Sequence, residues 1–138
     1  MSTRPFEILA HTADTGIATT GDTLGDVIAN AAHGMLALMY DMSAARPTRN
    51  VEFAVAAPTP AELLVDVLVE LLYRSEVDDV SFTDLVVNTE CLHAGITARA
   101  VPTDTLELRG PPIKAVTYHD LRCEHVGDRW EARVIFDV

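Results

Sequence analysis

The chain has 138 residues, 49% of them hydrophobic, and a formal net charge of −11 at pH 7. This length predicts one domain, over residues 1–138, that is large enough to bury an apolar core. So acidic a surface repels nucleic-acid phosphates, which argues against direct, stable binding of RNA or DNA. A basic protein partner or bound cations fit the charge better, although an acidic surface also serves solubility alone.

Targeting and redox signals are sparse. No apolar run reaches the roughly 18 residues that suggest a membrane span. The N-terminal residues lack the apolar stretch of a signal peptide, so we expect a cytoplasmic protein without membrane contact. Cys91 and Cys123 are the two cysteines, and in a reducing compartment we expect both thiols to be free.

The first half of the chain predicts two short strands, a helix and a third strand. Residues 6–10 and 15–20 are β-prone and flank a turn. Thr23 is a suitable N-cap for a helix in which apolar residues recur at helical spacing up to about Tyr40. After a polar connection, residues 51–55 alternate between apolar and polar, as in a half-buried strand.

A second helix is marked by its N-terminal residues. Thr59 is the expected N-cap, Pro60 takes the first helical position and Glu62 completes a capping box. After this helix in the sequence, residues 80–88 and 91–101 predict a hairpin that turns around Asn88-Thr89-Glu90.

The rest of the chain predicts a loop over 102–112 and two strands over 114–125 and 130–137. Strands therefore dominate both ends, with two helices in the first half. This order indicates an α+β fold: a single two-layer domain with a mainly antiparallel or mixed β-sheet and two helices packed on one face.

Acidic groups follow apolar strand residues at both ends of the chain. Asp14 lies in the N-terminal motif, and Asp137 follows Val134-Ile135-Phe136, next to the terminal carboxylate of Val138. If the two strands pair, three acidic groups converge, and oxygen ligands of this kind suit Ca, Mg or Mn. Taken alone, Asp14 is more typical of a residue that caps a turn before Gly16.

Separated motifs in this order resemble those of the archease family. They are His11-Thr12-Ala13-Asp14 with Gly16-Ile17, the helix end Glu70-Leu71-Leu72-Tyr73, Lys114-Ala115-Val116-Thr117-Tyr118-His119, and Val134-Ile135-Phe136-Asp137-Val138. The resemblance spans the whole chain. One departure is Thr15, where the family usually has an aliphatic residue after the motif Asp.

The resemblance implies a function without catalysis by the chain itself. Archeases assist RtcB-type RNA ligases in tRNA splicing or RNA repair, where they promote guanylylation of the ligase and its multiple turnover. They bind a divalent cation, and the matching positions here are Asp14, Asp137 and Val138.

Three further residues lie near the motifs. Lys114 is the only lysine in the chain, and its ammonium group suits a phosphate or a partner carboxylate, unless it is an ordinary strand-end lysine. His119 is either a hydrogen-bonded histidine of the sheet or a proton and hydrogen-bond partner of the site. His11 is either a metal ligand or a locally bonded residue.

Two enzymatic interpretations remain as alternatives. The same acidic site could activate water in a metal-dependent hydrolase, such as a phosphatase or nuclease. Asp14-Thr15-Gly16 also matches the short signature of aspartic proteases, but the residues before it are not strongly apolar. The sequence has no nucleotide-binding glycine motif.

Overall fold

The computed structural model describes residues 5–10 and 14–138, without the side chains of Leu9, Ala10 and Asp14. Its elements in chain order are β1 (Phe6–Ala10), β2 (Asp14–Gly21), α1 (Leu24–Met39), β3 (Arg49–Ala56), α2 (Pro60–Asp78), β4 (Val80–Glu90), β5 (His93–Pro102), a 3₁₀ turn (Thr103–Thr105), β6 (Ala115–Val116), β7 (Arg122–Val126) and β8 (Arg129–Asp137).

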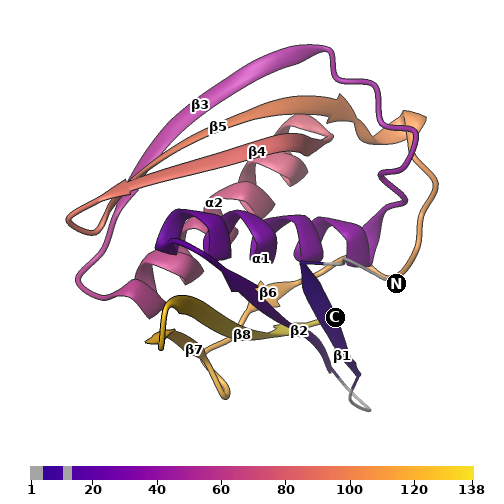
Figure 1. Ribbon diagram of the computed structural model, residues 1–138. Coiled ribbons are helices and arrows are strands. Elements are labelled where there is room, and N and C mark those ends of the chain that lie inside the picture. The colour runs from indigo at the N-terminus through magenta and orange to yellow at the C-terminus, as the bar shows by residue number, and fades with distance from the viewer. Residues whose placement is uncertain (1–4, 11–13) are drawn as a thin grey trace.

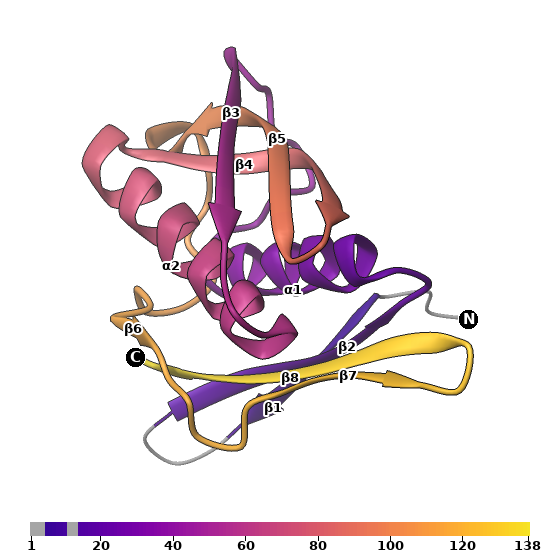
Figure 2. The ribbon, with the colours of Figure 1, turned by 90° about the vertical axis from the view of Figure 1, so that its left-hand side faces the viewer.

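The described strands form two sheets, and both helices lie between them (Figure 1). One sheet has the order β1-β2-β8-β6, with β7 also paired to β8, and the other has the order β3-β5-β4. Each described pair is antiparallel. The expected α+β class is confirmed, and helices cover one face of each sheet. Where we expected two layers, the second sheet adds a third (Figure 2).

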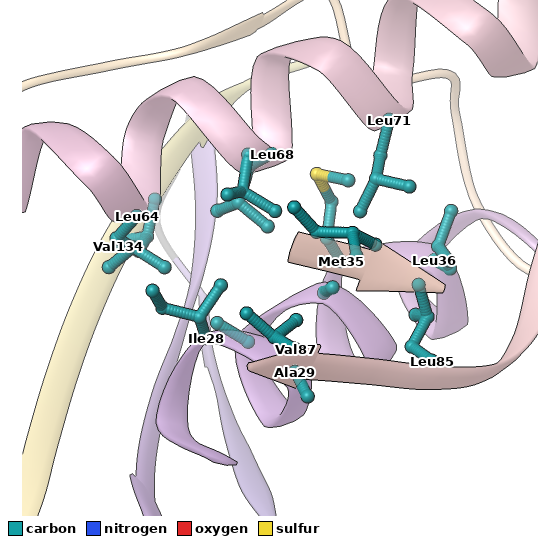
Figure 3. Close-up of a cluster of buried hydrophobic side chains, with 14 of the residues drawn as sticks. Ile28, Ala29, Met35, Leu36, Leu64, Leu68, Leu71, Leu85, Val87 and Val134 are labelled. Carbon is teal, nitrogen blue, oxygen red and sulfur yellow. The ribbon is translucent and has the colours of Figure 1, made fainter. Parts of the chain in front are cut away.

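The third layer follows from the composition of α1. Its buried positions include the consecutive residues Val27, Ile28 and Ala29, so the helix is apolar around most of its circumference. Such a helix needs cover on two opposite sides, which one sheet cannot supply. Figure 3 shows the resulting core, in which Ile28 and Met35 of α1 lie among side chains of α2, β4 and β8.

The predicted helix starts are confirmed. The Thr23 side chain accepts a hydrogen bond from the N–H of Asp26, and the Thr59 side chain accepts one from the N–H of Glu62. Each bond satisfies a donor that the first helical turn leaves free. Neither of the helices described has a stretch that is both long and apolar enough to cross a membrane.

The turn of the β4–β5 hairpin was predicted at the wrong place. It lies at Cys91 and Leu92, with φ values of 47° and 63°, so β4 continues through the predicted turn to Glu90. Two-residue hairpin turns of this conformation usually carry Asn or Gly. Cys and Leu give no such signal, whereas Asn88 in the strand gives a misleading one.

The single strand predicted over 114–125 was also wrong. The structure has β6 and β7 there, and both pair with β8. Between them the chain turns through Asp120, whose φ is 50°. The Thr117 hydroxyl donates to the carbonyl oxygen of Ile135 at 2.9 Å. The backbone N–H of Thr117 donates to the same oxygen at 3.0 Å, so both groups of Thr117 bond to β8 where the chain leaves it.

The cysteines are free, as expected: Cys91 is exposed and Cys123 is buried. Burial, helped by the nearby charge of Glu124, raises the pKa of the Cys123 thiol to about 12. This thiol therefore stays protonated and unreactive at neutral pH.

Gly25 provides a test of the contact between α1 and the second sheet. A Cβ at this position would meet the carbonyl oxygen of Val87 on β4. Gly25→Ala should therefore lower the free energy of unfolding by about 1–3 kcal/mol, measured by urea denaturation. Gly95→Ala is the matched control, because its nearest neighbour would lie 4.0 Å away. Equal urea midpoints for the two variants would contradict this close packing.

Candidate functional site

The C-terminal end of β8 lies between two other strands. Asp137 is opposite Asp14 of β2 on one edge and opposite Ala115 of β6 on the other. The backbone N–H of Lys114 donates to the carbonyl oxygen of Asp137 at 2.8 Å. The backbone thus brings positions 14, 114 and 137 together, although they are far apart in the sequence.

Apolar residues of β8 fix this arrangement. Val134 and Phe136 are completely buried in the core that the helices cover. Because strand side chains alternate between faces, Asp137 points away from the face that buries Phe136, and it is exposed. Val138 is half-buried and packs against the core, which holds the chain end beside Asp137.

The charged side chains described at this end have no ionic partners. Within residues 5–10 and 14–138, neither Asp137 nor Lys114 takes part in an ion pair. Both are exposed. An acidic and a basic group are therefore available here to an external ligand or partner.

The three predicted neighbours are placed differently. Lys114 adjoins Asp137 through the backbone, as described above. His119 lies in the turn between β6 and β7, with its side chain 72% exposed and Nε2 3.5 Å from a carboxylate oxygen of Asp120. It therefore lies outside the strands of the sheet, and its role at the site stays a prediction. His11 lies outside the described residues.

None of the described His, Cys, Asp and Glu side chains form a group of three that could hold a metal ion. The predicted set has a different composition. The predicted metal ligands include the side chain of Asp14, which is not among the described side chains, and the terminal carboxylate of Val138. The cation site therefore stays a prediction.

Sequence reasoning missed two residues that position this end of the sheet. The Thr117 hydroxyl anchors the chain after β6 to Ile135 and accepts from the N–H of His119 at 3.3 Å. Gly16 lies opposite Ile135. A Cβ there would come within 2.6 Å of the Val134 carbonyl oxygen. The glycine in the motif was the available signal, but it indicated a turn as readily as a close strand contact.

Gly16→Ala tests whether the pairing of β2 with β8 needs this close contact. The added methyl should push β2 away from β8 and lower the free energy of unfolding by about 1–3 kcal/mol in urea denaturation. The open position Gly95 again supplies the control variant, Gly95→Ala. Unfolding midpoints that are the same in both variants would show that the two strands do not need the glycine.

Comparisons with known proteins cover almost the whole chain. Residues 6–138 match the model of the Archease protein family (MTH1598/TM1083). Protein archease of Methanopyrus kandleri is 32% identical over 145 residues, which span 97% of this chain and 99% of the relative. Protein archease of Methanosarcina acetivorans is 35% identical over 141 residues, which span 98% and 97%.

Solved structures agree with the fold. The solution structure of Methanobacterium thermoautotrophicum protein 1598 superposes with a TM-score of 0.77 at 26% identity, over 99% of this chain and 100% of that one. The crystal structure of a Thermotoga maritima archease, described as a possible chaperone, gives a TM-score of 0.69 at 20% identity over 96% of each chain. At that identity the second likeness shows the fold alone. From the family match and the curated relatives, we conclude that this chain belongs to the archease family.

Proposed function

We propose that the chain activates an RtcB-type RNA ligase, promoting its guanylylation and multiple turnover in tRNA splicing or RNA repair. Family membership supports a role of this type. The observation that carries the proposal is the register of β8, which brings Asp137 opposite Asp14 beside the chain end. The chain would act on its partner and catalyse nothing itself.

A divalent cation, Ca, Mg or Mn, is part of this proposal. Asp14, Asp137 and the terminal carboxylate of Val138 would hold it. The donor chemistry fits, because all three groups offer oxygen atoms, which hard cations prefer. The exposed Asp137 side chain also has no ion-pair partner among the described residues. When bound, the cation supplies a positive centre for oxygen groups of a nucleotide or of the ligase.

The remaining groups suggest how the chain meets its partner. The backbone of Lys114 bonds to the same strand end and its side chain is exposed, so its ammonium group can meet a phosphate or a partner carboxylate. The net charge of −11 favours a basic, RNA-binding protein over RNA itself. The description of the Thermotoga maritima protein as a possible chaperone is compatible with action on another protein.

Added metal should raise the melting temperature of the free protein. A ligand bound only to the folded state stabilises it by roughly 2.7 kcal/mol at a hundredfold excess over its dissociation constant. Asp14→Asn and Asp137→Asn should each remove most of the shift in a thermal melt with Ca, Mg or Mn. Glu52→Gln, an exposed acid on β3, should keep it. A full metal response in both Asp variants would overturn the site assignment.

The role of the chain end can be tested with tags. A C-terminal tag removes the carboxylate of Val138 from its place beside Asp137, so it should weaken metal binding in calorimetric titration. The same tag at the N-terminus should leave the affinity unchanged. Equal affinities of the two tagged proteins would mean that the terminal carboxylate is not a ligand.

Ligase assays test the function directly. Small amounts of the protein, added to an RtcB-type ligase with GTP and divalent metal, should increase guanylylation and convert one round of joining into many. Asp14→Ala, Asp137→Ala and Lys114→Ala should fold and lose most of this effect, because they remove metal contacts or the ammonium beside them. Glu52→Gln is the control on the other sheet.

Two results would count against this function. If all three site variants stimulate like the wild type, the acidic end of β8 has only a structural role. If the isolated protein hydrolyses phosphate esters or RNA in the presence of metal, the hydrolase alternative replaces the activator.

A further inference from the structure

A groove of about 720 Å³ runs beside the candidate site. The C-terminal half of α2 forms one wall, and the other is formed by Pro112–Val116, which includes β6, with Tyr40 at the end of α1. Figure 2 shows α2 above β6 and the C-terminus, and β6 pairs with the end of β8. Lys114 and Ala115 line it, and both contact Asp137 through the backbone.

Apolar and aromatic side chains of α2 are exposed along this groove. Val69 is 47% exposed and Tyr73 is 60% exposed, and Leu72 between them is partly buried against the core. Ile113 on the opposite wall is buried. Exposed tyrosines that lie next to buried apolar residues are typical of the residues that dominate protein–protein interfaces.

Carboxylates also line the groove. Glu76 and Asp79 contribute to its lining, and Asp104 lines an adjoining hollow that shares Tyr40 and Asp79 with it. Over the part of the chain that the structure describes, none of these three acids takes part in an ion pair. Lys114, at the end near Asp137, is the one basic residue among the lining residues. The groove is therefore apolar at its base and acidic along its rim.

We propose that this groove docks a segment of the ligase that carries apolar and basic side chains. The apolar side chains would cover Val69 and Tyr73, and the basic ones would pair with Glu76, Asp79 and Asp104. The inference rests on the activator function proposed above. It assigns that function a docking surface separate from the acidic end of β8, which the docked segment would bring to the ligase.

Electrostatic repulsion makes other occupants of the groove unfavourable. An RNA strand would place phosphates against unpaired carboxylates. A second copy of this chain, bound through the same groove, would bring two acidic rims together, and like charges at an interface are costly. A basic segment removes the repulsion among the acids and gains electrostatic steering toward them.

The test measures the dissociation constant between the purified ligase and variants of the full chain. Tyr73→Ala should raise this constant roughly tenfold or more, because it removes a central aromatic contact. Glu76→Lys should also raise it and should reduce its dependence on salt concentration. Both residues are exposed, so the variants should keep the wild-type melting temperature and its increase with metal.

Matched controls lie on the other sheet. Val86 of β4 is 50% exposed, and Val86→Ala should leave the dissociation constant unchanged. Glu52→Lys on β3 reverses an exposed charge away from the groove. It should weaken binding less than Glu76→Lys does, since it lacks a direct contact.

The outcomes separate this inference from the proposed function. If the wild type stimulates the ligase and Asp137→Ala does not, but Tyr73→Ala and Glu76→Lys bind like the wild type, the groove is not the docking surface. If light scattering shows a dimer that Tyr73→Ala dissociates without changing ligase binding, the occupant is a second copy. If the wild type neither binds nor stimulates the ligase, the proposed function itself fails.

Discussion

The pairing of β8 on both edges is the constraint on which the site depends. Its backbone bonds to β2 on one side and to β6 and β7 on the other, so the polar groups of an apolar strand are satisfied. Val134 and Phe136 must face the core, and a slip of one residue would reverse every side chain of the strand. The register that turns Phe136 toward the core therefore turns Asp137 to the other face, where it is exposed, at the position opposite Asp14. Core packing and site geometry are two consequences of one strand register.

Both helices pack against the sheet that contains β8. They lie between the two sheets, so α1 packs on β8 from one side and on β4 from the other. Because Gly25 has no side chain, the backbone of α1 can approach the backbone of Val87 closely, and α1 lies close against the second sheet. The same layering places the C-terminal half of α2 beside β6 and leaves Val69 and Tyr73 exposed next to the acidic strand end. A partner bound at α2 would therefore lie beside Asp137.

Residue preferences within short segments predicted much of the fold and of the candidate site. Thr23 and Thr59 mark the helix starts, and the apolar run before Asp137 indicates a core strand with an acid at its end. The hairpin turn at Cys91 and Leu92 was not predictable, because left-handed φ values there are imposed by strand pairing and not by residue preference. The third layer was missed because periodicity identified one apolar face of α1, whereas its small residues allow burial on two sides. The groove unites residues from distant segments, which no local pattern connects.

Metal binding at the end of β8 is the central claim, and paramagnetic broadening by Mn²⁺ in amide NMR spectra tests it most directly. Substoichiometric Mn²⁺ should first broaden the signals of residues 14, 114–116 and 137–138, which the strand register brings together. Signals from β3, β4 and β5 on the other sheet should stay sharp. The account is contradicted if broadening begins at the acids of the groove, Glu76 and Asp104, or spreads evenly over the acidic surface while residues 137–138 are spared.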